Sequence, residues 1–152
     1  MASDSVSSDS VSASTVIDAP ASELFDLVAD PTMHAVFDGS GHVLGTRAAS
    51  HKLALGERFT TSNRIGVPYL ISNKVVEYEE GRRIAWAHIG GWRWRYEFED
   101  VEGGTLVTET FDWSTTLAKP YIQFAGWGPR NLANMERTLE RLEAFITNGR
   151  GT

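Results

Sequence analysis

The sequence predicts an α+β domain in which a curved antiparallel sheet of about seven strands wraps around a long C-terminal helix. Three observations lead to this fold class. One strand pattern and two short helical segments come first, six strand patterns follow at intervals of about ten residues, and a long helical pattern ends the chain. No helical segment separates the six strands, which favours hairpins over a parallel sheet. One helix rarely fills the concave side of a bent sheet, so we expect a mainly apolar cavity between them.

The first elements are a strand at 10–17 and two short helices. Residues 10–17 place apolar and small side chains at every second position, which is typical of a strand. A helix is expected at 22–29, because Pro20 suits its start and Asp30-Pro31 ends it. A second short helix is expected at 31–37.

The remaining elements follow from a change of period. Turn residues, mostly glycine, separate strands expected at about 42–48, 56–65, 69–79, 82–89, 92–100 and 105–114. The final helix carries apolar residues at steps of three and four, and Asn148-Gly149 is expected to end it. These apolar residues are Leu132, Met135, Leu139, Leu142 and Ile146.

Length and charge limit the possible classes of protein. The 152 residues suit a single domain over 10–149, preceded by a flexible tail at 1–9 that has no basic or apolar signal segment. The net charge of −6 argues against a nucleic-acid partner, and no apolar run is long enough to span a membrane. The chain has no cysteine, which fits a reducing cytoplasm, the compartment we expect.

The faces of the strands predict which residues line the cavity. In residues 92–99 four aromatic residues alternate with four charged ones, so the aromatic residues share one face. The same alternation in the other strands, together with the stripe of the last helix, gives the candidate ligand-binding residues. They are Phe59, Asn63, Trp86, Trp94, Tyr96, Phe98, Phe111, Trp113, Met135 and Leu139. These side chains can equally serve as packing residues of a core.

Glu109 is the notable polar residue of the inner face, since it lies between Val107 and Phe111 in the sequence. A buried carboxyl group must be paired, hydrogen-bonded or protonated. We expect a polar cluster of Glu109 with His88 and Asn63, in which Glu109 and His88 are the candidate catalytic residues. The alternatives are that Glu109 reaches the open mouth of the sheet or pairs with an arginine. His34 is expected to be a packing or surface residue.

Motifs of other chemistries are absent from the sequence. There is no G-x-S-x-G nucleophile motif, no H-E-x-x-H zinc motif and no phosphate-binding glycine loop. Four scattered histidines without cysteine do not suggest a metal site, so we expect neither a metal nor a cofactor. Any catalysis would then be acid–base chemistry by His88 and Glu109 in a cavity that excludes water.

Seven segments of the chain are distinctive: 16–25 (VIDAPASELF), 30–34 (DPTMH), 38–41 (DGSG), 66–69 (GVPY), 81–86 (GRRIAW), 94–98 (WRYEF) and 108–114 (TETFDWS). They resemble the START-like (SRPBCC) superfamily, in a bacterial, actinobacterial branch that includes polyketide cyclases and dehydrases. The likeness covers residues about 10–147. The resemblance implies a helix-grip, Bet v 1-like fold with a deep hydrophobic cavity, but no particular activity.

Three functions compete at this point. The first is binding or transport of a small hydrophobic ligand, such as a lipid, a polyketide or an aromatic molecule. The second is a polyketide cyclase or dehydratase-like enzyme that uses the same cavity. The third is a non-catalytic homodimeric interaction module, in which the aromatic loop at 119–127 forms the contact; the same loop can instead cover the cavity as a lid.

Overall fold

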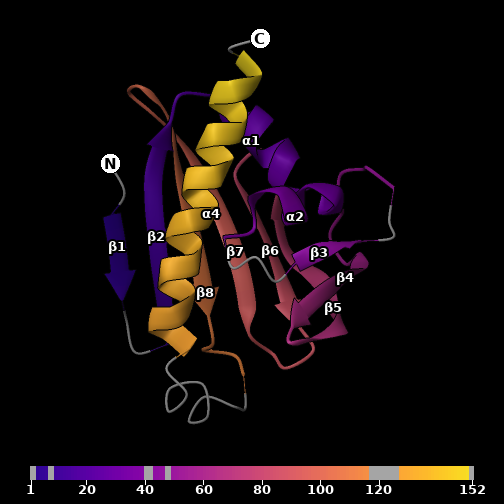
Figure 1. Cartoon of the computed structure of the whole chain (residues 1–152). Coiled ribbons are helices and arrows are strands. Elements are labelled where there is room, and N and C mark those ends of the chain that lie inside the picture. The colour runs from indigo at the N-terminus through magenta and orange to yellow at the C-terminus, as the bar shows by residue number, and fades with distance from the viewer. Residues whose placement is uncertain (1–2, 7–8, 40–42, 47–48, 117–126, 151–152) are drawn as a thin grey trace.

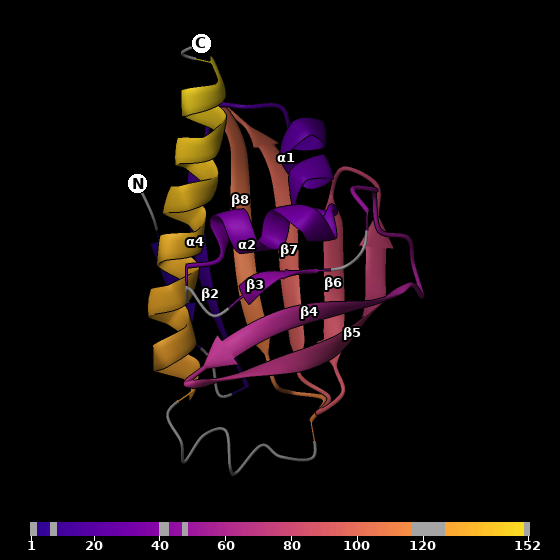
Figure 2. The same cartoon turned by 45° about the vertical axis from the view of Figure 1, so that its right-hand side comes forward.

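The computed structural model describes residues 3–6, 9–39, 43–46, 49–116 and 127–150. Over these residues an antiparallel eight-stranded sheet curls around one long helix, α4 (Trp127–Arg150), as Figures 1 and 2 show. The strand order is β1-β2-β8-β7-β6-β5-β4-β3. The strands are β1 (Ser3–Val6), β2 (Ser10–Ile17), β3 (Val43–Thr46), β4 (Arg58–Ile65), β5 (Val67–Glu79), β6 (Arg83–His88), β7 (Arg93–Val101) and β8 (Gly104–Asp112).

The fold class predicted from the sequence is confirmed, and the seven expected strands correspond to β2–β8. The prediction of a flexible tail is wrong for Ser3–Val6, which form the edge strand β1 and pair with β2 from Ser3↔Ser14 to Val6↔Val11. A short polar strand has no apolar face of its own to reveal it in the sequence. It is held by the backbone hydrogen bonds that the edge of β2 offers.

The two expected short helical segments follow β2. The first buries an apolar face against the sheet, while the second begins as a 3₁₀ turn that Asp30 caps by accepting a hydrogen bond from the Thr32 amide at 2.9 Å. No helix among the described residues is long and apolar enough to cross a membrane. The helical elements are α1 (Ala21–Val28), the 3₁₀ helix η1 (Pro31–Met33) and α2 (His34–Phe37).

Helix α4 lies against β2 and β8 and also contacts the end of α2. At this contact a side chain on Gly39 would place its Cβ 2.2 Å from the Asn134 carbonyl oxygen. The Gly39 amide donates to the Thr138 hydroxyl at 2.8 Å, and Arg137 Nε donates to the Gly39 carbonyl at 2.9 Å. This close approach fixes α4 over the concave side of the sheet. The helix continues to Arg150, past the end expected at Asn148-Gly149.

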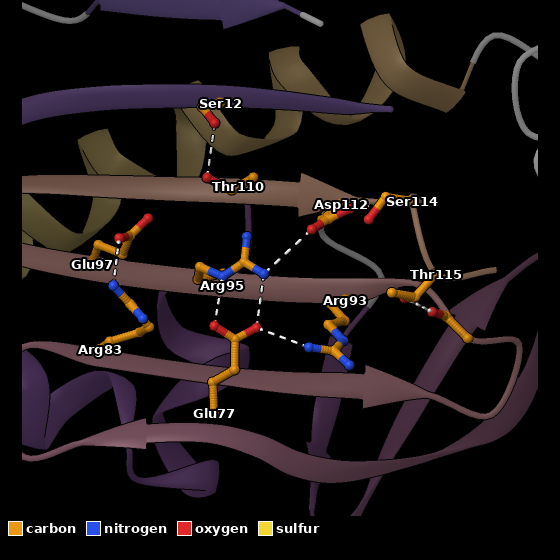
Figure 3. A network of polar contacts seen from close by, with 11 residues as sticks. Ser12, Glu77, Arg83, Arg93, Arg95, Glu97, Thr110, Asp112, Ser114 and Thr115 are labelled. Carbon is orange, nitrogen blue, oxygen red and sulfur yellow. Dashed lines mark hydrogen bonds and ion pairs between the residues drawn. The ribbon is translucent and has the colours of Figure 1, made fainter. Parts of the chain in front are cut away.

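The convex face of the sheet carries the charged residues that alternate with the aromatic ones. Figure 3 shows Arg95 between Glu77 and Asp112, with Arg93 beside it. Arg95 donates to both carboxylate oxygens of Glu77, at 3.0 and 2.7 Å, and contacts Asp112 at 3.3 Å; Arg93 Nη1 donates to Glu77 at 3.1 Å. On this face two arginines are therefore balanced by two carboxylates.

Candidate functional site

A cavity of about 500 Å³ lies between the concave face of the sheet, α2 and the first half of α4. Its volume lies within the range of sites that bind small organic molecules. Most of the predicted residues line it: Phe59, Asn63, Trp86, His88, Trp94, Tyr96, Glu109, Phe111 and Met135. Strand alternation predicts the inner face for all of these residues except Met135, which the apolar stripe of the last helix predicts.

Phe98, Trp113 and Leu139 are buried but do not line the cavity. All three belong to the buried apolar cluster, Phe98 from β7, Trp113 directly after β8 and Leu139 from α4. The ring of Phe98 packs edge-on against Phe25 of α1 at 5.8 Å, and Trp113 lies 5.4 Å from Phe111. These three residues belong to the core, and their expected role in ligand binding is not supported by their positions.

The wall of the cavity is built around the indole of Trp86. Phe59 approaches it edge-on at 5.6 Å and Tyr96 lies at 5.7 Å, measured between ring centroids. Across the wall Trp94 packs on Phe111 at 4.8 Å. Rings that are locked against each other keep the cavity open at little cost in side-chain entropy, because they have few rotatable bonds.

Glu109 is buried in this wall, with 4% of its surface exposed. The strand register places it opposite Tyr96, whose hydroxyl donates to Glu109 Oε1 at 2.9 Å. Oε2 has no hydrogen-bond partner among the described residues. Burial raises the pKa of Glu109 to about 8; the bond from Tyr96 opposes this shift and the charge of Asp38 adds to it. Glu109 is therefore mainly protonated at neutral pH.

The expected cluster of Glu109, His88 and Asn63 does not form, although all three residues line the cavity. His88 stacks on Trp92 with ring centroids 4.3 Å apart, and its Nδ1 accepts a hydrogen bond from the Gly90 amide at 2.8 Å. Burial lowers the pKa of His88, which favours the neutral ring. The strand register keeps Glu109 and His88 apart. Tyr96 of β7 lies opposite Glu109 of β8 on one side and opposite Ile84 of β6 on the other. His88 lies four residues, or about 13 Å, beyond Ile84 along β6.

His34 is a cavity residue whose contribution was not expected. Its ring stacks on Trp86 at 4.8 Å, and Nε2–H donates to the Val28 carbonyl at 2.9 Å. Burial lowers the pKa of His34, so the ring is held neutral as part of the aromatic wall. No periodic pattern in the sequence indicates this position, because η1 and α2 are too short to show a clear period.

One polar side of α4 also lines the cavity and was missed. It comprises Arg130, Asn131, Asn134 and Thr138, which flank the apolar residue Met135. Their spacing of three to four residues places them on one helical face and was readable in the sequence. The apolar stripe by itself predicts Met135 but not the polar residues beside it. The predicted lid or dimer loop at 119–127 lies outside the described residues except for its last position.

The chain matches the family described as polyketide cyclase/dehydrase and lipid transport over residues 8–146. It is also 38% identical over 146 residues to the uncharacterized protein Rv0088 of Mycobacterium tuberculosis. That alignment covers 92% of this chain and 65% of the relative, so the chain spans just under two thirds of the length of this curated relative.

Solved bacterial structures share the fold at low sequence identity. A Rhodobacter sphaeroides protein superposes with a TM-score of 0.75 at 15% identity, covering 97% of this chain and 99% of its own. Protein Ms6760 of Mycobacterium smegmatis gives 0.70 at 16% identity, covering 98% of each chain. An AHSA1-like protein of Aeromonas hydrophila gives 0.64 at 23% identity, covering 89% of this chain and 92% of its own. With the resemblance inferred from the sequence thus confirmed, the chain belongs to the polyketide cyclase/dehydrase and lipid transport family.

Proposed function

We propose that this protein binds a small hydrophobic molecule that carries a hydrogen-bond acceptor such as a carbonyl group. The observation that carries the proposal is the carboxyl group of Glu109, which lines an aromatic cavity with one oxygen unpartnered among the described residues. An unpaired buried polar atom costs free energy, so a ligand that pairs with it gains affinity over one that does not.

The direction of the hydrogen bond follows from protonation. Oε1 of Glu109 accepts the hydrogen of Tyr96, and the raised pKa keeps a proton on the carboxyl group at neutral pH. That proton belongs on Oε2, because Oε1 already serves as the acceptor. A ligand oxygen near Oε2 would then receive a hydrogen bond, while the faces of Trp86 and Phe111 contact its apolar body.

The test compares two flat ligands that differ only in a carbonyl group, fluorene and 9-fluorenone. Their affinities are measured by displacement of the neutral fluorescent dye N-phenyl-1-naphthylamine. After correction for the different water solubilities of the two ligands, wild type should bind fluorenone about fivefold more tightly than fluorene. This ratio corresponds to the free energy of one net hydrogen bond. Glu109→Leu should lose this preference. Glu109→Gln should keep it, because the amide accepts from Tyr96 and donates to the ketone in the same geometry.

Glu97→Leu is the matched control, since Glu97 lies on the outer face of β7 and pairs with Arg83. It should leave both affinities unchanged. A wild-type protein that binds both ligands without preference would contradict the role of Glu109 but not a hydrophobic cavity. Failure to bind the dye or either ligand would contradict the proposed function itself.

The second candidate function is a cyclase- or dehydratase-like enzyme in the same cavity. It is favoured by the pKa of Glu109, because a group that titrates at about 8 both donates and accepts protons near neutral pH. The two candidates differ in their response to one substitution. Glu109→Gln preserves the hydrogen bonds of the protonated acid but cannot transfer a proton, so it should bind as wild type does and lose all turnover.

We propose the cytoplasm as the compartment in which the protein acts. The chain has no cysteine and therefore needs no oxidising environment for its fold. Fractionation of the native host, with detection of the full chain by antibody, tests this assignment. Recovery mainly from a compartment other than the cytoplasm would contradict it.

A further inference from the structure

Exposed apolar side chains border the mouth of the cavity. Lining residues are at least partly exposed at Tyr69 of β5, beside the turn that joins β6 to β7 and at Arg130 in the first turn of α4, and the mouth lies among them. Beside Tyr69 the side chains of Val67 and Leu70 are each 69% exposed. In the β6–β7 turn, directly after His88, Ile89 is 86% exposed. Two separate turns therefore present apolar side chains at the same opening.

The segments that form this opening contain no acidic residue, although the chain as a whole has a net charge of −6. Asp and Glu are absent from 58–76, from 84–96 and from 127–135. Asp112, at the end of β8, is paired with Arg95, and Asp38 and Glu109 line the cavity itself.

Basic residues occupy the outer face of the β4–β5 hairpin without acidic partners. Arg58 and Lys74 lie directly opposite each other in the register, an arrangement of like charges that destabilises a sheet. Arg64, near the tip of the hairpin, and Arg130, at the start of α4, are exposed. Within the part of the chain that the structure describes, none of these four side chains forms an ion pair. A like-charged pair left without a partner is explained if an external anionic surface supplies the counter-charge.

Acidic residues gather at the opposite end of the sheet. Glu79 at the end of β5 and Glu80 in the turn to β6 lie there, as do Asp100 near the end of β7 and Glu102 in the turn to β8. Figures 1 and 2 both place the β7–β8 turn at the top and the start of α4 at the bottom, with the β4–β5 turn at a similar low level. The molecule is therefore polar along its length, and such a field orients the basic end toward an anionic surface.

We propose that the end of the molecule that carries the cavity mouth docks on an anionic lipid bilayer. Val67, Leu70 and Ile89 would enter the interfacial region, while the hairpin and α4 basic residues face the lipid head groups. A nucleic acid would be attracted by the same charges but gains nothing from exposed aliphatic side chains. A bilayer uses both features, and it is also where a hydrophobic ligand concentrates, so docking would place the mouth at its source.

The experiment is co-sedimentation of the full chain with vesicles of phosphatidylcholine containing about 30% phosphatidylglycerol, and with vesicles of phosphatidylcholine alone. The protein should partition onto the anionic vesicles at least tenfold more strongly than onto the neutral ones in low salt. Half-molar salt should remove most of this difference, because the range of the electrostatic attraction falls to a few ångström.

Variants then test the surface. Arg64→Glu, and separately the double change Val67→Ser with Leu70→Ser, should each reduce partition onto anionic vesicles by about tenfold. The matched controls are Arg82→Glu and Leu55→Ser. Arg82 lies in the β5–β6 turn and contacts Asp100, while Leu55 is 64% exposed and does not line the cavity. Both controls should partition as wild type does.

Circular dichroism and the dye titration described above accompany each variant. Retained dye binding together with lost vesicle binding shows that the docking surface alone was altered, whereas loss of dye binding concerns the proposed function. The docking proposal is overturned if wild type does not prefer anionic vesicles, if Arg64→Glu leaves partition unchanged, or if the controls weaken it equally. Binding to DNA or to an acidic protein, without binding to vesicles, would also overturn it.

Discussion

Replacing Glu109 by Gln should stabilise the protein more strongly as the pH rises from 5 to 8. In the folded protein burial raises the pKa of Glu109 to about 8, whereas in the unfolded chain the carboxyl group keeps its ordinary value of 4.5. Between these values the unfolded chain loses its proton and the folded protein retains it. Folding stability is thus intact below pH 4.5, falls as the pH rises and is lowest above 8. Gln does not titrate and is free of this loss.

The magnitude follows from the two pKa values. Over the interval from pH 5 to pH 8 the linkage relation gives a change of about 3 to 4 kcal/mol in the free energy of unfolding. For a chain of this size that corresponds to roughly 10 °C in the melting temperature. The assay is urea unfolding of wild type and Glu109→Gln at pH 5, 6, 7 and 8, followed by circular dichroism. Groups that titrate equally in both proteins cancel in the comparison.

Glu99→Gln provides the control, because Glu99 is exposed on β7 near Glu109 in the sheet. Its difference from wild type should stay constant within about 0.5 kcal/mol over this pH range. The reasoning is refuted if the difference between Glu109→Gln and wild type is also constant. That result would mean that the carboxyl group is solvated or paired at neutral pH, and is not an acid that retains its proton.

Three further substitutions test the surroundings of the site. Tyr96→Phe removes the hydrogen bond that lowers the pKa of Glu109. The midpoint of the pH titration of Glu109, followed by the ¹³C carboxyl chemical shift in NMR, should therefore move to higher pH, and an unchanged midpoint would contradict that contact. Arg95→Met should cost about 1 to 2 kcal/mol in urea unfolding at pH 7, and the cost should shrink as the pH falls through the lowered pKa values of Glu77 and Asp112. A cost that does not depend on pH would exclude the ion pairs as its cause. Gly39→Ala should destabilise by about 3 kcal/mol, because the added Cβ meets the Asn134 carbonyl; a stability equal to wild type would show that α2 and α4 are farther apart.

Strand alternation made the wall of the cavity predictable. In the stretch around Tyr96 only one assignment of faces keeps the aromatic residues together and the charged ones in water. The structure has this arrangement, with Tyr96 buried on the inner side and Arg95 bound to Glu77 on the outer side. A period of two determines the face of each residue in a strand without a bulge, so the inward position of Glu109 also follows from it.

Position along the sheet was not predictable in the same way. Alternation gives the face of His88 but not the pairing between strands, and it is the register that joins Glu109 to Tyr96. A bulge in β5 between Val75 and Glu77 shifts the pairing of β5 with β6, and no residue pattern in the sequence predicts this bulge. Alternation likewise places Phe98 on the inner face of β7, but it does not indicate that α1 covers the sheet at that position.

The most direct test of the account is native mass spectrometry of the full chain with added 9-fluorenone, for wild type and for Thr61→Phe. Thr61 is buried and lines the cavity, so the larger side chain should fill part of it. The account predicts one ketone per chain for wild type and little or none for Thr61→Phe, which should remain folded by circular dichroism. Equal binding by both proteins, or no binding by wild type, would contradict the claim that this cavity is a ligand site.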